Sequence, residues 1–208
     1  MSALTVYRAL MTALGPVVML YLIRRLAAGK EDRARFAERR GVASRARPQG
    51  PLVWVHAASI GEAVSMLALI DALVAERPSV SVLVTTGTVT SARLLAARLP
   101  EERAWHQYVP VDRPAYVRRF LDHWQPDLAL WVESELWPNI ILESKARGVP
   151  LVLVNGRMSQ RSFDGWQRWP GVIRPVLGAF DLCLGQDVVQ AERLRQLGAE
   201  RTLCVGNL

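Results

Sequence analysis

The sequence is poor in the residues that build disulfide frameworks and metal centres. It has two cysteines among its 208 residues, Cys183 and Cys204, and both lie in apolar stretches that look like strands. We therefore expect reduced core thiols rather than a disulfide. The three histidines, His56, His106 and His123, fall in separate predicted elements without the spacing of metal ligands. These scarcities argue against a disulfide-stabilised module and a metalloenzyme, and we expect no metal and no bound cofactor.

Three common site motifs are also missing. The chain contains no G-x-G-x-x-G and no G-x-x-x-x-G-K-[ST], so the sequence offers no nucleotide-binding loop. It also lacks G-x-S-x-G, the strand–turn–helix motif of α/β-hydrolases, and Ser59 therefore has no assigned base partner. Any chemistry must come from other polar residues.

The sequence does contain a regular alternation of strand-like and helical segments. Half of its residues are hydrophobic, which is enough for a full core. Short β-branched runs predict buried parallel strands, and the segments between them have helical periodicity. Strands are expected near residues 52–55, 80–85, 106–111, 127–133, 151–154, 181–185 and 201–205. This order predicts an α/β fold, with a Rossmann-like, doubly wound parallel sheet over residues 51–208.

An apolar run over residues 3–23 precedes that domain. It has the length of a transmembrane helix, although Arg8 interrupts it and Pro16 lies within it. Three interpretations stay open: a spanning anchor with its basic flank in the cytoplasm, an interfacial helix, and a buried N-terminal core helix. We expect a hydrophobic membrane anchor over residues 1–25 and a basic membrane-proximal segment over residues 26–50.

Most of the net positive charge lies in one band, over residues 24–47. The band contains nine Arg or Lys and three acids, so it carries +6 of the net charge of +7. Such an excess predicts an anionic partner. Nucleic acid fits poorly, because no nucleic-acid-binding motif follows the band. Anionic membrane lipids fit better, since they attract each such charge by about 1 kcal/mol.

Polar residues collect where three of the predicted strands end, at residues 59–62, 133–139 and 155–162. Parallel strands present their carboxyl ends on one edge of the sheet, so the three clusters are expected to converge on one cleft. Acidic residues beside cations suit general-base activation of a hydroxyl near an anionic substrate.

Each candidate residue also has a purely structural interpretation. Glu62 stands at a predicted helix start, where the helix dipole favours an acid. Glu133 can be an ion-pair partner, and Arg157 and Arg161 can be solvated surface residues. The residues alone therefore indicate a membrane-associated α/β domain and leave open whether it is an enzyme.

Five segments taken together resemble one known family. They are WVHAASIGE at 54–62, VTTGTVTSA at 84–92, ESELWPN at 133–139, NGRMSQRS at 155–162 and the terminal GNL. In this order and spacing they resemble the N-terminal half of the 3-deoxy-D-manno-octulosonic acid (Kdo) transferases, the lipid A glycosyltransferases of Gram-negative bacteria. The apolar N-terminus and its basic continuation agree with that family, and the resemblance covers nearly the whole chain.

The resemblance implies the N-terminal, acceptor-binding domain of a GT-B glycosyltransferase at the cytoplasmic face of the inner membrane. Such an enzyme transfers Kdo from CMP-Kdo to the lipid A precursor, a phosphorylated and acylated glucosamine disaccharide, with inversion and without a metal ion. The motif match makes Glu62 the general base and gives Glu133 a role in transition-state stabilisation. Ser59, Arg157 and Arg161 are candidates for binding the acceptor. The implied partners are this precursor and anionic inner-membrane lipids, and not nucleic acid.

The sequence departs from the family pattern at its end. The family continues after GNL with a lysine and a CMP-Kdo domain, whereas this sequence stops at Leu208. We therefore expect an acceptor half without its donor domain, inactive on its own. A membrane-anchored module that binds an anionic glycolipid without chemistry is the alternative. Other two-domain sugar-nucleotide enzymes fit less well, because of the segment 133–139 and the apolar N-terminus.

Overall fold

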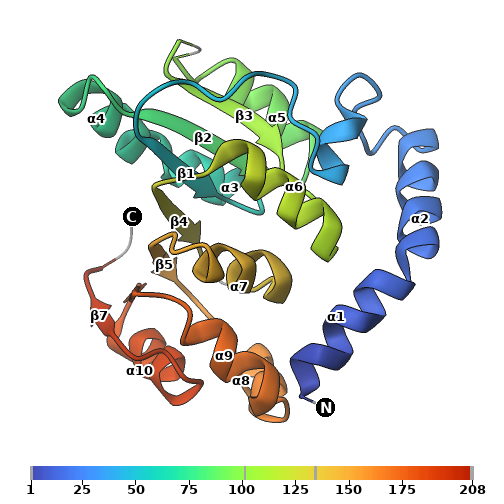
Figure 1. Cartoon of the computed structure of the whole chain (residues 1–208). Helices are drawn as coiled ribbons and strands as arrows, with labels where there is room; N and C mark the ends of the chain where they lie inside the picture. Colours follow the sequence, from blue (N-terminus) through green and yellow to red (C-terminus); the bar gives the residue numbers. More distant parts are fainter. Residues whose placement is uncertain (1, 101, 134, 207–208) are drawn as a thin grey trace.

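The computed structural model describes residues 2–100, 102–133 and 135–206 (Figure 1). Within these residues, parallel strands form one sheet in the order β3-β2-β1-β4-β5-β6-β7. The strands are β1 Leu52–His56, β2 Ser81–Thr86, β3 Ala104–Tyr108, β4 Leu128–Val132, β5 Leu151–Gly156, β6 Leu182–Gly185 and β7 Thr202–Cys204. The predicted Rossmann-like parallel sheet is confirmed.

Helices cover both faces of the sheet. One face packs against α6 (Pro114–Trp124), α7 (Pro138–Ala146) and α9 (Pro170–Leu177). The other packs against α3 (Ile60–Ser65), α4 (Leu67–Glu76) and α5 (Val89–Ala96). Two further helices, α8 (Gln160–Gln167) and α10 (Val188–Gln196), follow β5 and β6, and α10 contacts β6 and β7.

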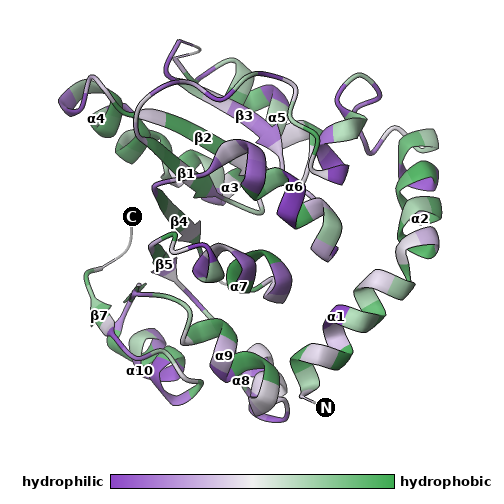
Figure 2. Cartoon of the chain, in the orientation of Figure 1, coloured by the Kyte–Doolittle hydropathy of each residue, from purple (hydrophilic) through white to green (hydrophobic). Residues whose placement is uncertain are grey.

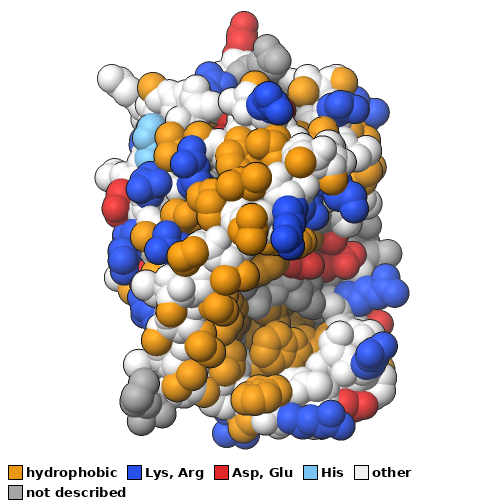
Figure 3. All heavy atoms as spheres, turned by 90° about the vertical axis from the view of Figure 1, so that its right-hand side faces the viewer, with side chains coloured by type: hydrophobic (Ala, Val, Ile, Leu, Met, Phe, Trp, Pro, Cys, Tyr) orange, Lys and Arg blue, Asp and Glu red, His pale blue; other side chains and the backbone are white. Residues whose placement is uncertain are grey.

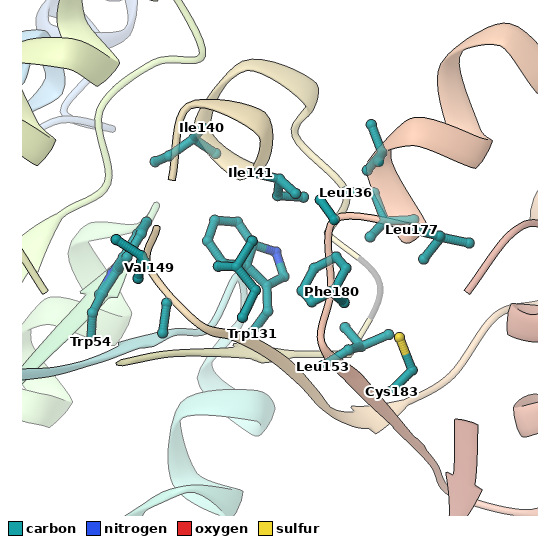
Figure 4. Close-up of a cluster of buried hydrophobic side chains, with 14 of the residues drawn as sticks. Trp54, Trp131, Leu136, Ile140, Ile141, Val149, Leu153, Leu177, Phe180 and Cys183 are labelled. Atoms are coloured by element: carbon teal, nitrogen blue, oxygen red, sulfur yellow. The ribbon is translucent and has the colours of Figure 1, made fainter. Parts of the chain in front are cut away.

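The alternation of side chains along each strand divides the core in two. Trp54 and Trp131 point to the α6–α7 side, whereas Val53, Val55 and Leu130 point to the opposite side. Figure 4 shows Trp131 between the sheet and α7. Because successive strand residues face opposite ways and both faces are covered, the strands read as continuous apolar runs rather than as alternating ones.

Several predicted elements need correction. The helix expected from Glu62 begins at Ile60 and breaks at Met66 into α3 and α4. Ser65 donates its hydroxyl proton to the Glu62 carbonyl (2.9 Å), a bond that competes with regular helical pairing. Val64, two residues before the break, is exposed.

Two further differences lie near the C-terminus. The passage that contains Trp166, Trp169, Pro170 and Pro175 forms helices α8 and α9, which the sequence pattern did not predict. Helix α9 begins on Pro170. Proline suits the first helical position, where its missing N–H is not needed. Cys183 is a buried core residue as expected, but Cys204 is exposed, because β7 is an edge strand of the sheet.

The apolar N-terminus forms two helices, α1 (Ala3–Ala13) and α2 (Gly15–Ala27), which meet at an angle of 59°. Of the described helices, none alone has the length and apolar character of a membrane span, although this bent pair together does. Figure 1 shows the pair alongside the domain, and Figure 2 shows the apolar residues that recur along it. The predicted spanning anchor is therefore not confirmed.

Polar contacts attach α1 to the domain. The Tyr7 hydroxyl donates to the Asp112 carboxylate (2.8 Å), and Arg8 forms an ion pair with Glu143 of α7. Asp112 is fully buried and also accepts from backbone amides at the start of α7. The first helix is thus tied to the element that follows the 133–139 segment.

Part of the basic band is turned toward the protein. Glu31 is buried and pairs with Arg25 (2.6 Å) and Arg39 (3.4 Å). Glu38, in the short 3-10 helix Phe36–Arg40, pairs with Arg35 (2.9 Å). Other basic residues remain exposed, among them Arg24, Lys30 and Arg33.

Candidate active site

The polar strand ends meet at the point where the strand order reverses. From β1 the chain continues outward to β2 and β3, and then returns to β4 on the other side of β1. His56 of β1 lies opposite Trp131 of β4, and Val132 of β4 lies opposite Val154 of β5. The segments that follow these strands therefore leave the sheet side by side. In open α/β sheets this switch point is where ligands bind.

The turn after β1 fixes Glu62 by hydrogen bonds at both ends of the residue. Ser59 is the N-cap of α3, and its hydroxyl accepts the Glu62 backbone N–H (3.3 Å). The Glu62 carboxylate reaches back, and its Oε2 accepts the Ala58 N–H (2.7 Å). This reciprocal arrangement is a variant of the capping box, in which the acid would bond to the N-cap amide itself. The Glu62 side chain is buried and oriented, and one carboxylate oxygen is left for other partners.

The segment after β4 brings two more carboxylates. Glu133 has a left-handed backbone (φ 56°), and its N–H donates to the Val154 carbonyl (2.9 Å). A non-glycine residue in this region costs about 1–2 kcal/mol, and such strain persists where surrounding structure imposes it. Glu135 accepts a hydrogen bond from the Trp137 indole (2.8 Å).

These carboxylates influence one another electrostatically. Desolvation raises the pKa of Glu133, the charge of Glu62 raises it further, and Arg157 opposes the rise. Desolvation and the charge of Glu62 also raise the pKa of Glu135, against the effect of its hydrogen bond from Trp137. Glu62, Glu133 and Glu135 thus form one acidic cluster, with Arg157 as the nearby cation. Like charges close together favour the protonated form, and this effect adds to desolvation in raising the pKa of Glu133 and Glu135.

The end of β5 contributes a second strained residue, and the segment after it contributes cations. Asn155 is buried and, like Glu133, has φ 56°. Arg157 and Arg161 are both exposed, and Arg161 lies in the first turn of α8. Of the two, only Arg157 appears among the charges that act on the carboxylate cluster in the described structure.

Two cavities adjoin the cluster and share Glu135 and Trp137 as wall residues. The first, which we call the α2 pocket, has a volume of about 460 Å³ and lies between α2 and the ends of β1, β2 and β3. The second, which we call the apolar groove, has a volume of about 750 Å³. Its wall includes Val6, Leu10, Trp137, Trp166, Trp169 and Val172. Figure 3 shows a hollow lined by hydrophobic side chains on this side of the molecule.

The structure brings together Ser59, Glu62, Glu133 and Arg157, as expected from the convergence of parallel strand ends. The position of Ser134 lies outside the described residues. The sequence did not reveal that Glu135 lines both cavities, or that Asp112 accepts hydrogen bonds from the start of α7. No spacing signal pointed to Asp112, because its partners are about 30 residues away or at the N-terminus. In the described ranges, no three His, Cys, Asp or Glu side chains are grouped to hold a metal ion.

This architecture, a seven-stranded parallel sheet within the described residues with a polar switch point, has the Rossmann-like α/β fold of one half of a GT-B protein. Solved structures share the fold at low sequence identity. S. aureus MnaA in complex with UDP has a TM-score of 0.54 at 17% identity, over 76% of this chain and 45% of that one. A putative UDP-N-acetylglucosamine 2-epimerase from Listeria monocytogenes has a TM-score of 0.55 at 13% identity, with the same coverage.

The sequence comparisons are more specific. The family model described as 3-deoxy-D-manno-octulosonic-acid transferase (Kdo transferase) matches residues 34–208. The chain belongs to this family of glycosyltransferases. It is 36% identical to the enzyme of that name from Rickettsia bellii, over 93% of this chain and 46% of the relative. It is 37% identical to the probable mitochondrial enzyme of Arabidopsis thaliana, over 93% of this chain and 43% of the relative. The chain spans about half the length of these curated relatives.

Proposed function

We propose that this chain is the acceptor-binding half of an inverting glycosyltransferase that transfers Kdo from CMP-Kdo to a lipid A precursor. The observation that carries the proposal is the acidic cluster at the switch point. In it a buried, hydrogen-bonded Glu62 acts electrostatically on Glu133 and Glu135, and Arg157 acts on Glu133. Family membership supports the transferred sugar, and the cluster supports base catalysis.

In this proposal Glu62 is the general base. The Ala58 N–H occupies one carboxylate oxygen, so the other takes the proton of the acceptor hydroxyl. The hydroxyl oxygen then forms a bond to the anomeric carbon of Kdo from the side opposite the leaving group. The bond from that carbon to the phosphate of CMP breaks, and CMP departs with the electron pair. The anomeric configuration is therefore inverted.

Glu133 has a complementary role in the proposal. Glycosyl transfer develops positive charge at the anomeric carbon in an oxocarbenium-like transition state. A carboxylate in a partly desolvated position stabilises that charge more strongly than it would in water. The left-handed backbone of Glu133 directs the chain away from the sheet at this point. Ser59, Arg157 and Arg161 are proposed to contact the acceptor, the arginines through its phosphates.

The surroundings of the cluster support a lipid acceptor. The apolar groove shares wall residues with the α2 pocket, so a glycolipid can place hydrocarbon in the groove while its sugar stays near Glu62. Exposed apolar side chains along α1 and α2 suit insertion into a lipid surface. We propose location at the cytoplasmic face of the inner membrane, with the exposed basic residues of the band near anionic headgroups.

The test is a transferase assay of the protein expressed from its complete reading frame, with CMP-Kdo and the tetra-acylated, bisphosphorylated disaccharide. Glu62→Gln is expected to reduce kcat by about 10²–10⁴-fold, the range that a general base contributes. Glu76→Gln, at the exposed end of α4, is the matched control and is expected to leave kcat unchanged.

Retained activity in Glu62→Gln would remove this residue as the base. Binding of the disaccharide by the unmodified protein without any turnover would instead support a glycolipid-binding module.

A further inference from the structure

His56 lines the α2 pocket, and one of its ring nitrogens has no hydrogen-bond partner in the described part of the chain. Its Nδ1 lies 2.9 Å from the Thr85 hydroxyl, which also accepts the Trp54 indole N–H (2.8 Å). Its Nε2 is buried and has no hydrogen-bond partner among the described residues. Buried polar atoms without partners are rare in folded proteins, and each needs an explanation.

The imidazole of His56 is neutral at physiological pH. Burial lowers its pKa to about 3, and the nearby Arg39 guanidinium also lowers it, against a hydrogen bond with Thr85 that raises it. A neutral Nε2 either donates or accepts one hydrogen bond, depending on the tautomer. A hydroxyl group can pair with Nε2 in either tautomer, since it has one donor and two acceptor lone pairs. A phosphate dianion only accepts, and a hydrocarbon does neither.

The pocket around His56 adjoins the proposed base. Ala58 lines the α2 pocket, and its N–H is the group that holds Glu62 Oε2. On another side the wall is formed by Trp137, whose ring offers an apolar face, and by Leu22 of α2. Apolar walls with a few placed polar groups are the usual make-up of a small-molecule site. The volume of about 460 Å³ leaves room for a sugar ring.

We propose that the α2 pocket binds a hydroxyl-bearing sugar ring of the acceptor, with His56 Nε2 bonded to a ring hydroxyl. The inference rests on the proposed function and deepens it: His56 positions the ring so that another hydroxyl of the acceptor faces Glu62. The Trp54–Thr85–His56 hydrogen bonds hold the imidazole for this purpose, and α2 closes the pocket from outside. His56 is a positioning residue and takes no proton in the reaction.

The direct test observes His56 in the unmodified protein. Protein labelled with ¹⁵N-histidine is titrated with the de-acylated glucosamine disaccharide bisphosphate, and the His56 signals are assigned by their loss in His56→Gln. We expect a change of the Nε2 resonance on adding the disaccharide, with His106 unaffected. His106 is a matched internal control, because it is also buried and neutral, with a pKa of about 3, but does not line the pocket.

Two outcomes would overturn the inference. One is an unchanged His56 signal at about 10 mM disaccharide, well above the dissociation constant of even a weak millimolar ligand. The other is an equal change with inorganic phosphate alone, which would make the pocket an anion site.

Variants give a second readout. We expect His56→Gln to raise the KM for the acceptor about tenfold with a smaller effect on kcat, and His106→Gln to leave KM unchanged. Equal effects of the two substitutions would indicate a structural role for His56. Turnover with an unresponsive His56 would leave the proposed function standing without this inference. A responsive His56 in a protein without turnover would leave this inference about the pocket standing without the proposed transferase function.

Discussion

Glu62 uses its two carboxylate oxygens for different purposes. Oε2 accepts the Ala58 N–H and so completes the cap of α3, while the remaining oxygen is available to a substrate. The structural and catalytic interpretations of this residue are therefore compatible. A helix-start acid that is also buried at the switch point keeps its orientation without a further partner.

Because the two carboxylate oxygens have different roles, two substitutions of Glu62 should have different effects. Glu62→Gln retains an oxygen for the Ala58 N–H, so it should lose the base and keep the cap. Glu62→Ala should lose both, with an additional cost of about 1 kcal/mol in unfolding free energy. Urea denaturation measures this difference, and equal stability of the two variants would show that the capping bond contributes nothing.

Buried histidines make the stability of the fold depend on pH. Burial lowers the pKa of His106 from 6.5 to about 3, so between these values the unfolded chain binds a proton that the folded chain does not. The contribution of His106 to stability is therefore full above pH 6.5 and is lost as the pH falls toward 3. His56 acts in the same direction, whereas Asp112, with its pKa raised to about 6 mainly by burial, opposes it.

The substitution His106→Gln should remove the part of the stability loss at low pH that comes from His106. We expect the unfolding free energy of the parent protein to fall by about 2 kcal/mol more than that of the variant between pH 6.5 and about pH 5. Urea denaturation at a series of pH values checks the slope. Parallel curves for the two proteins would contradict the assignment of His106 as a neutral, buried residue.

Sequence motifs predicted candidate site residues at this scale but not the contacts that hold them in place. Glu62, Glu133 and Glu135 all stand in recognisable segments, but the sequence did not show that Glu135 lines both cavities. Asp112 gave no signal, since its importance comes only from α1 and α7 folding against it.

At the scale of elements, α7 is positioned by a carboxylate from outside the helix. Asp112 Oδ2 accepts the Asn139 N–H (3.0 Å), and Oδ1 accepts the Ile140 N–H (2.8 Å). The same carboxylate accepts the Tyr7 hydroxyl of α1. One buried side chain thereby satisfies the free amides of a helix start that has no N-cap side chain of its own.

Removing Asp112 should therefore cost more than removing Tyr7's hydroxyl. Asp112→Ala leaves two buried amides unpaired and is expected to lower the unfolding free energy by about 2–4 kcal/mol. Tyr7→Phe removes one hydrogen bond and should cost about 1 kcal/mol. Thermal and urea denaturation of both variants test this order, and a larger effect of Tyr7→Phe would reverse our account of what Asp112 stabilises.

Strong periodicity predicted most elements, and failures occurred where local chemistry overrides periodicity. The helix after β1 breaks where Ser65 bonds to the Glu62 carbonyl. The third strand was predicted to begin two residues late and to end three residues late, because β3 ends at Tyr108 and the apolar residues after it continue as a loop. Helices α8 and α9 were missed because tryptophans and prolines conceal a helical pattern.

At the scale of the whole molecule, α1 and α2 form an apolar surface on one side. Leu10, Leu14, Val17, Leu20 and Ile23 are each between 44% and 60% exposed, far more than core residues. Figure 3 shows hydrophobic side chains gathered on this side with Lys and Arg around them. Tyr7 of α1 bonds to Asp112, and Arg25 of α2 pairs with the buried Glu31 just beyond the helix. These contacts favour a helix pair that lies on a membrane.

Charged substitutions on this surface should release the protein from vesicles. We expect Val17→Glu and Leu20→Glu each to weaken binding to anionic vesicles about tenfold, since a buried apolar side chain contributes roughly 1.5 kcal/mol. Val188→Glu, on α10, is the control: Val188 is 72% exposed, and the charge change is the same. Co-sedimentation measures the affinities. A comparable loss in the control variant would mean that net charge alone governs binding.

The exposed part of the basic band makes a separate contribution. Arg24→Glu should weaken vesicle binding most at low salt, because surface charges are screened as ionic strength rises. The effect should shrink at high salt, whereas that of Val17→Glu should persist. A salt-independent effect of Arg24→Glu would point to a packing role instead.

The central position of β4 has a consequence for biosynthesis. When β1 and β2 have left the ribosome, β1 still has one unpaired edge, and its partner β4 begins about 70 residues after β1 ends. At roughly 5–20 residues per second, that edge waits on the order of ten seconds. Exposed strand edges can pair with other chains, so the nascent protein is prone to aggregate during this interval. The strand order that places the ends of β1 and β4 side by side at the site thus also leaves one edge of β1 unpaired while β2 and β3 are being made.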